Sequence, residues 1–315
     1  HDVSRQSIFF EPNIWLKGNA WEIKAKMNSE FPDLTTMVNY RDDSNPMNII
    51  LGNTQLRNIH YYDIEGGKTF EGKKHSRLNI NTGYHQTDNA VAYSLVFDKQ
   101  TGVSTVQPIS VNGNYRIDLG IGYTRPLDKK EKLSIDNQAS FNYNHNVDMA
   151  MVQGATQSQR SIVNNWKISN VLKLNYRLDD NYEFTLHGGG TYYLIKSQRE
   201  GFNNIHAGDY NIGVNVQVAL PWKLQLTTDL TMFARRGYQL SEMNTTDWIW
   251  NAQLSRSFIN KKLLVKLQGF DILRQLSNTQ YLMNAQGRTE TWNNSIPRYM
   301  MLSLSWRFNV NPKKK

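Results

Sequence analysis

Hydrophobic and polar residues alternate along most of this chain, and a period of two is typical of β-strands. The clearest example is near the C-terminal end, where residues 299–308 read Y-M-M-L-S-L-S-W-R-F. One face of this segment is polar, and the other carries Leu302, Leu304, Trp306 and Phe308. A strand that crosses a membrane shows hydrocarbon to lipid and polar groups to a lumen, with aromatic residues where the bilayer ends. The segment is therefore predicted to be the last strand of a transmembrane β-barrel, and its apolar face the signal for a barrel-assembly machinery.

The same alternation recurs upstream, in segments that are joined by short polar turns at one end and by longer loops at the other. Residues 115–123, 166–176, 182–194, 210–220 and 263–267 show it clearly, and strands are also expected near 9–16, 21–30 and 56–70. In total the pattern predicts roughly 13 antiparallel strands and an all-β fold.

The segments 75–98 and 106–123 are longer than the 9–11 residues that one crossing needs, so their far ends are expected to project beyond the membrane. The apolar positions change parity between Tyr84 and Val91. A β-bulge near residues 86–89 is the predicted cause.

An odd number of strands is unusual, because single-chain bacterial barrels have an even number with both ends in the periplasm. Lipid does not tolerate the unpaired edge of an incomplete sheet. Either the count misses one strand or the N-terminal part of the barrel lies upstream, and we expect the second. Residues 1–309 are then a C-terminal barrel portion with long extracellular loops, and residues 310–315 a basic periplasmic tail.

The composition agrees with a barrel. Mean hydropathy is only −0.60, and no apolar run approaches the ~18 residues of a spanning helix. A barrel shows both features because half of each strand faces water. The chain holds 16 Tyr and 8 Trp, residues that favour membrane interfaces, and several lie next to predicted strand ends: Tyr123, Tyr143, Tyr176, Tyr182 and Trp222.

Charge and reactive residues indicate little chemistry. The formal charge of +9 comes partly from turn clusters such as Lys129-Lys130 and Lys261-Lys262, which form no continuous stripe, so nucleic acid is not an expected partner. The chain has no cysteine, and its seven histidines show no metal-binding spacing. The glycines 188–190 lack the context of a phosphate-binding loop and suit barrel curvature instead. We expect no catalytic residue, no metal site, no cofactor and no enzymatic activity.

Some carboxylates lie within predicted strands (Asp63, Glu65, Asp118, Asp136 and Glu183), where two could meet as an acid/base pair or, more simply, line a polar lumen. The loops 149–160, 198–209, 237–247 and 275–295 are rich in amide and aromatic side chains that suit sugars and peptides. They are either ligand-binding loops or ordinary barrel loops. Tyr281 and Trp292, in the last of them, are the candidate ligand-binding residues.

Residues 45–58, N-P-M-N-I-I-L-G-N-T-Q-L-R-N, resemble the loop motif N-P-L-x-I-x-x-G-N-P-x-L-K-P of the TonB-dependent receptors and outer-membrane barrels of Bacteroidetes-type bacteria. Residues 111–116, 125–130, 220–226, 269–273 and 296–300 also match this family, in the same order. Thr54 and Asn58 stand where the family usually has prolines.

The resemblance implies the C-terminal part of a 22-stranded barrel in the outer membrane of a Gram-negative bacterium. The whole receptor would import a glycan, a peptide or a siderophore-like ligand through a plugged lumen. Its partners would be outer-membrane lipid, TonB acting through the plug, and an extracellular lipoprotein. No plug or TonB box is recognisable within residues 1–315. Two alternatives stay open: a passive or structural barrel without a plug, and a soluble β-rich carbohydrate-binding or adhesion protein. Aromatic residues at strand ends favour a membrane barrel over the soluble protein.

Overall fold

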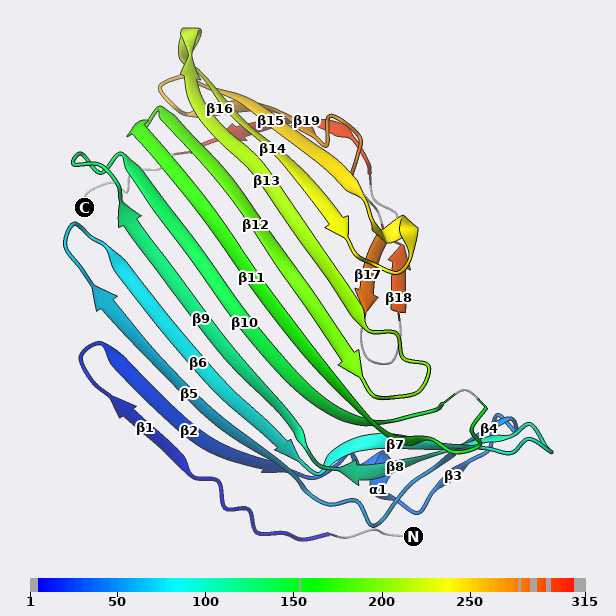
Figure 1. Cartoon of the computed structure of the whole chain (residues 1–315). Helices are drawn as coiled ribbons and strands as arrows, with labels where there is room; N and C mark the ends of the chain where they lie inside the picture. Colours follow the sequence, from blue (N-terminus) through cyan, green and yellow to red (C-terminus); the bar gives the residue numbers. More distant parts are fainter. Residues whose placement is uncertain (1–4, 153, 277–278, 284–287, 293–295, 309–315) are drawn as a thin grey trace, which may run out of the picture.

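The fold is dominated by one antiparallel sheet of 13 strands, seen along its length in Figure 1. The structure is a computed structural model that describes residues 5–152, 154–276, 279–283, 288–292 and 296–308. In sheet order the strands are β1 (Asn13–Lys17), β2 (Trp21–Glu30), β5 (Ile59–Glu71), β6 (Arg77–Asp88), β9 (Asn114–Pro126), β10 (Leu133–Ala150), β11 (Gln159–Asp179), β12 (Tyr182–Ser197), β13 (Ile205–Leu220), β14 (Leu224–Arg236), β15 (Thr246–Phe258), β16 (Leu263–Phe270) and β19 (Tyr299–Trp306). The predicted all-β fold and its strand number are confirmed.

Short turns and long connections occupy opposite ends of this sheet (Figure 1). At one end the turns span only two to six residues; residues 221–223 form one of them, in which Trp222 has a φ of 62°. At the other end lie the remaining smaller elements: α1 (Leu34–Met37), β3 (Arg41–Asp42), β4 (Asn48–Leu51), β7 (Ala90–Phe97), β8 (Ser104–Val111), the short helical turn Ser241–Met243, β17 (Thr279–Met283) and β18 (Arg288–Trp292). Barrels in the outer membrane place short turns in the periplasm and long loops outside the cell.

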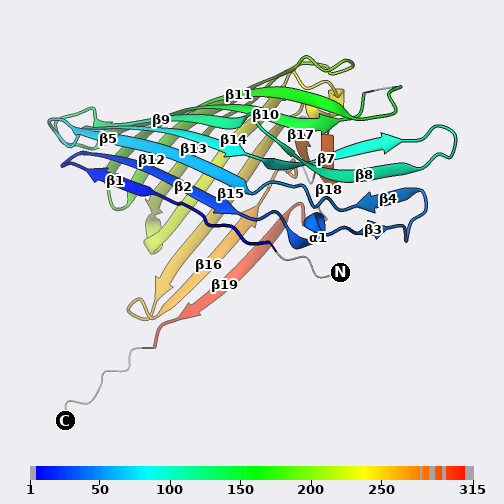
Figure 2. The same ribbon diagram turned by 90° about the horizontal axis from the view of Figure 1, so that it is seen from below.

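A second sheet of four strands, in the order β3-β4-β8-β7, projects from the long-loop end (Figure 2). It corrects one prediction. The chain has no bulge at residues 86–89; β6 ends at Asp88, Asn89 takes a left-handed φ of 57°, and β7 then pairs with β8 in the second sheet. The change of parity therefore marks a departure from the main sheet. The predicted projection of these segments beyond the membrane is consistent with this arrangement.

The two faces of the main sheet differ as the alternation predicts. One face is apolar and exposed: Ile168 is 52%, Ile212 50% and Leu304 68% accessible. Apolar side chains at this exposure require lipid rather than water. The opposite face carries most of the polar residues of the same strands. The apolar face is called the lipid face below, and the other the polar face.

Aromatic rings border the lipid face at both ends of its apolar band. Near the long loops, rings of neighbouring strands follow one another across the sheet, with centroids 6.1 Å apart for Tyr84 and Tyr115, 5.8 Å for Tyr115 and Tyr143, and 5.1 Å for Tyr143 and Trp166. At the short-turn end of the same strand as Trp166 lies Tyr176, which packs against the ring of Phe184. Ten positions of a tilted strand span about 25 Å of membrane thickness, the height of the apolar band of outer-membrane barrels.

Few residues of the described chain are buried, and those with apolar side chains lie in the loops or in the loop-proximal halves of the strands. One cluster unites Val163, Ile195, Ile205 and Ala207, and another unites Ala92, Val111 and Val147. No helix in the described ranges is long and apolar enough to span a membrane.

The sheet has two edge strands, β1 and β19 (Figure 1). Each neighbouring pair in the sheet is antiparallel, so the first and thirteenth strands run in the same direction. Both edges also differ from their predicted bounds, because β1 begins at Asn13 and β19 ends at Trp306. Residues 309–315, with the predicted basic tail, lie outside the described residues.

Candidate functional site

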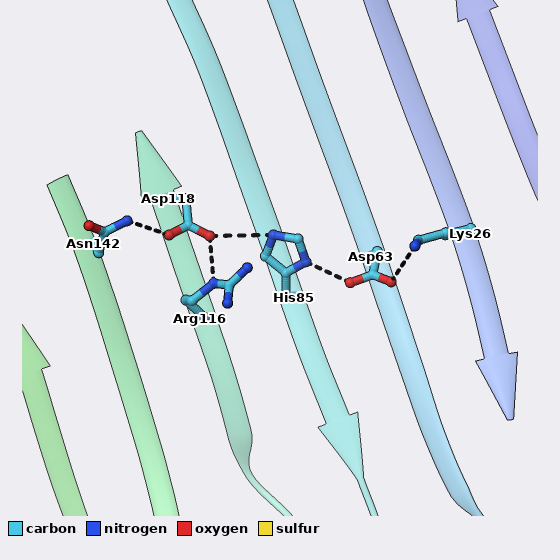
Figure 3. Close-up of polar contacts among 6 residues, drawn as sticks. All are labelled: Lys26, Asp63, His85, Arg116, Asp118 and Asn142. Atoms are coloured by element: carbon cyan, nitrogen blue, oxygen red, sulfur yellow. Dashed lines mark hydrogen bonds and ion pairs between the residues drawn. The ribbon is translucent and has the colours of Figure 1, made fainter. Parts of the chain in front are cut away.

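A row of charged side chains crosses the polar face from β2 to β10 (Figure 3). Its centre is His85 on β6. Each nitrogen of this ring lies close to a carboxylate on a neighbouring strand: Nδ1 is 2.6 Å from Oδ1 of Asp63 on β5, and Nε2 is 3.3 Å from Oδ2 of Asp118 on β9. The ring therefore connects three strands through their side chains, in addition to the hydrogen bonds between their backbones.

Each of the two carboxylates has further partners on its outer side (Figure 3). Nζ of Lys26 lies 3.4 Å from Asp63, and Nε of Arg116 lies 2.6 Å from Asp118. Asn142 on β10 donates a hydrogen bond from Nδ2 to the second oxygen of Asp118. From β2 to β9 the row therefore alternates cation, carboxylate, imidazole and carboxylate, and the amide of Asn142 on β10 completes it.

The strand register explains why these residues meet. Lys26 pairs with Asp63, Asp63 with His85, and His85 with Arg116, so all four stand side by side on one face. Side chains directly opposite each other in antiparallel strands lie about 5 Å apart at Cβ and interact. The side chains of His85, Asp63 and Asp118 are 21%, 18% and 28% exposed, so the interactions are partly shielded from water.

The geometry favours a structural and electrostatic role over chemistry. The ring of His85 contacts one carboxylate through each of its two nitrogens, and each contact reaches a neighbouring strand. The two carboxylates lie on opposite sides of the ring and do not converge on one point (Figure 3). Within the described residues, no group of three or more histidine and acidic side chains is arranged to hold a metal ion.

A hollow of about 400 Å³ lies beside this row on the same face. Its floor is largely bare backbone, because glycines stand on three adjacent strands: Gly67 on β5, Gly83 on β6 and Gly120 on β9. Its rim carries charge of both signs, including Lys24, Glu65 and Arg116, together with the histidine itself. The wall can therefore receive a polar group that carries hydrogen-bond donors, acceptors or either charge.

A second polar cluster lies on β13, β14 and the loop that follows β14, near the long-loop end. The Tyr238 hydroxyl donates to Oδ1 of Asp209 at 2.9 Å, and Arg235 lies 3.8 Å from the same carboxylate. Burial and the neighbouring Asp209 raise the pKa of Tyr238 well above its usual value. The tyrosine therefore stays neutral at physiological pH and fastens the loop between β14 and β15 to the wall.

The loop motif of residues 45–58 connects several elements at the long-loop end. Asn53 donates from its backbone N–H to the carbonyl of Thr36 at 2.8 Å and from Nδ2 to the carbonyl of Pro108 at 2.8 Å. Leu56, three positions later, is only 2% exposed. The motif thus joins α1, β8 and the start of β5 at the long-loop end. Gly52 is required here, because an added Cβ would clash with the carbonyl oxygen of Val38.

The predicted ligand-binding residues lie in the hairpin β17–β18 at the long-loop end. Tyr281 pairs with Glu290 and Trp292 with Thr279 in the backbone register. The side chains of both candidates lie outside what the structure describes. Their role stays a prediction.

The proposed C-terminal signal residues lie on the lipid face of the edge strand β19 or directly after it. Leu302, Leu304 and Trp306 are 65%, 68% and 46% exposed, and Phe308 is 81% exposed with its ring 6.2 Å from that of Trp306. They are placed for contact with lipid.

The structure places the predicted carboxylates in different surroundings. Asp63 and Asp118 flank one imidazole ring and form no acid/base pair with each other. Glu65 lines the hollow, Asp136 accepts a hydrogen bond from Thr124, and Glu183 lies 3.9 Å from Arg177. The sequence interpretation did not find the role of His85, Lys26, Arg116 or Asn142. Their only signal is that each stands at a polar position of an alternating strand.

Comparison with known proteins gives one family. The model of the outer membrane protein beta-barrel family matches residues 15–192 and, in a second overlapping match, residues 155–306. Together the two matches include all the strands of the main sheet apart from the start of β1. No curated protein matches the chain.

Proposed function

Since this chain belongs to the outer membrane protein beta-barrel family, we propose that it forms part of the wall of a TonB-dependent receptor, which imports a ligand through a plugged lumen. The chain lies in the outer membrane of a Gram-negative bacterium, with its lipid face toward the bilayer. In this proposal it catalyses no reaction and needs no cofactor.

The observation that carries the proposal is the width of the sheet. Thirteen strands already form one sheet, and its edge strands β1 and β19 run in the same direction. Antiparallel closure therefore needs an odd number of additional strands. Barrels of 16 to 18 strands enclose a water-filled channel, and a barrel of 22 strands holds a plug in its lumen. A barrel wider than this sheet is too wide for its own side chains to fill.

The polar face supports the same proposal. Its charged row and glycine-floored hollow offer donors, acceptors and both signs of charge at one place. A plug domain or a passing polar ligand can form hydrogen bonds with such a wall. TonB would act on the plug from the periplasmic side.

The long-loop end would capture the ligand, a glycan, a peptide or a siderophore-like compound. Tyr281 and Trp292 are the candidate contacts, because aromatic rings stack on sugars and peptides alike. An extracellular lipoprotein is a further partner in this proposal. Support for it comes from the projecting four-stranded sheet, where Ile50 and Tyr93 are 42% and 53% exposed. The barrel-assembly machinery would insert the chain through the β19 signal.

Conductance and uptake test the proposal together. In a planar lipid bilayer, the full-length protein should give no steady open channel, and uptake of its ligand by cells should stop when TonB is deleted. A steady channel together with TonB-independent uptake would refute the proposal and support a plugless passive barrel. The double variant Tyr281→Ala/Trp292→Ala should weaken ligand binding without changing the amount of folded barrel in the membrane.

A further inference from the structure

The short-turn end of the sheet carries a large excess of positive charge. The turns 72–76, 127–132, 180–181, 221–223 and 259–262 contain eight lysines and three acidic residues. The long connections at the other end, taken over their whole sequence, contain seven basic and eight acidic residues. The basic excess therefore belongs to the periplasmic rim of the barrel, where the headgroups of the inner leaflet lie.

One cation of this rim lies on the lipid face itself. Arg256 is two positions from the end of β15, and its register partners are Leu224 on β14 and Val265 on β16. Its Cζ atom lies 4.7 Å from the centroid of the Phe258 ring. Its Nε atom is buried without a hydrogen-bond partner, and no carboxylate of the described chain forms an ion pair with its guanidinium.

The same arrangement occurs on a second strand. Lys68 on β5 also stands on the lipid face, and its Nζ lies 4.7 Å from the centroid of the Phe70 ring. Like Arg256 and Phe258, Lys68 and Phe70 are two positions apart and lie near the end of a strand that runs toward the short turns. A cation paired with an aromatic ring therefore recurs where the lipid face meets the periplasmic leaflet.

A charge on the lipid face is costly unless it lies at headgroup depth and meets an opposite charge there. The depth of Arg256 fits the headgroup level, because it lies two positions before β15 ends at the short turn 259–262. The anion that a bilayer supplies at this depth is the lipid phosphate. A guanidinium matches phosphate geometry with two parallel hydrogen bonds.

We propose that Arg256 binds the phosphate of an anionic phospholipid in the periplasmic leaflet. Phe258 holds the guanidinium in place, and the turn lysines Lys223 and Lys261 add attraction for the negatively charged headgroup. The acyl chains lie against Leu226, Leu254 and Leu267, which follow on the same face on the side away from the short turns. The site does not depend on the proposed transport function, since it requires only a barrel in this membrane.

Native mass spectrometry of the full-length protein, titrated with phosphatidylglycerol in detergent, tests the site. Arg256→Gln should weaken phosphatidylglycerol binding about fivefold, the effect of one basic residue at a membrane surface. Lys266→Gln is the matched control, because Lys266 lies on β16 at a similar depth but on the polar face. It should bind the lipid like the unaltered protein. Inorganic phosphate should not compete, because it lacks the acyl chains.

Equal affinity of Arg256→Gln and the unaltered protein would overturn the proposal, as would an equal loss in Arg256→Gln and Lys266→Gln. Competition by inorganic phosphate would overturn the lipid as the occupant. Folding of each variant is checked by its heat-modifiable migration in gel electrophoresis. If Arg256→Gln fails to fold, Arg256→Lys decides: it keeps the charge but loses the planar fork, so unchanged affinity would refute the bidentate phosphate contact.

Discussion

The ion pair between His85 and Asp63 gives the sharpest test of the charged row on the polar face. Replacing His85 with alanine removes the ring that connects β5, β6 and β9. Replacing Asp63 with asparagine removes one of its two carboxylate partners without changing the size of the side chain. The double variant completes a thermodynamic cycle, which isolates the coupling between the two side chains from their separate effects.

The structure gives an estimate of this coupling. Nδ1 and Oδ1 are 2.6 Å apart, and the two side chains are 21% and 18% exposed. A hydrogen bond to an ionised carboxylate contributes about 1.5–3 kcal/mol. Desolvation of the two half-shielded groups removes part of this contribution. We therefore expect a coupling of about 1–2 kcal/mol, above the roughly 0.2–1 kcal/mol of most exposed pairs.

Urea unfolding of the protein in phosphatidylcholine vesicles, followed by tryptophan fluorescence, measures the free energies for the cycle. A matched control is the pair Arg41 and Asp43, which lies 3.3 Å apart at the long-loop end with 59% and 65% of its side chains exposed. The same cycle on this pair should show little coupling. If the coupling of His85 with Asp63 fell below about 0.5 kcal/mol and matched the control, the row would be a solvated surface rather than a connection between strands.

Three further predictions follow from single positions. Gly52→Ala should destabilise the extracellular loops by about 1–3 kcal/mol, and limited proteolysis should then cleave residues 31–58 faster. Gly120→Ala, whose Cβ would meet no atom within 4 Å, should not change the cleavage rate. Equal cleavage rates in the two variants would contradict the clash at Gly52. Val214→Arg, on the lipid face midway along β13, should cost about 2–4 kcal/mol of barrel stability in vesicles and Asn215→Arg on the polar face much less. Equal costs would contradict the assignment of the two faces. The backbone N–H of Leu133 donates to Asp128 and holds the pKa of this carboxyl below its usual value. The carboxylate therefore stabilises the turn at neutral pH, and this stabilisation is lost as the pH falls through the lowered pKa. Asp128→Asn should flatten the acid side of the stability profile measured by urea unfolding, and an unchanged profile would refute this role.

The main sheet could be predicted from the sequence because its signal is local. Alternation needs only neighbouring residues, so the predicted range 21–30 coincides with β2. The lipid face of β19 follows in the same way from Leu302 and Leu304. Turn residues such as Pro221 and Trp222 then separate the strands. Lipid strengthens this signal, because every second side chain of a membrane-spanning strand faces hydrocarbon and must be apolar.

The charged row could not be predicted, because it depends on register between strands far apart in the chain. His85 meets Asp63 across 22 positions and Asp118 across a long excursion through β7 and β8. Each residue alone looks like a polar position that faces water. The change of parity near Asn89 was ambiguous for a related reason: a bulge and a departure from the sheet leave the same local pattern. The pairing of β8 with β4, a contact between distant segments, distinguishes them.

The placement of the buried residues differs between the part of the chain that faces lipid and the part that faces water. Between the aromatic borders, apolar side chains need no protein partner because lipid covers them, so a residue such as Ile168 remains half exposed. Beyond the border near the long loops, water replaces lipid, and the same strands must bury their apolar residues against each other. Val163 and Ile195 do so on β11 and β12, and Leu56 does so within the loop motif. The extracellular part is therefore held by a hydrophobic core, whereas the membrane part is held by backbone pairing and polar contacts such as those of His85. The two parts should respond separately to mutation: a change at Leu56 should loosen the loops and leave the membrane-spanning wall intact.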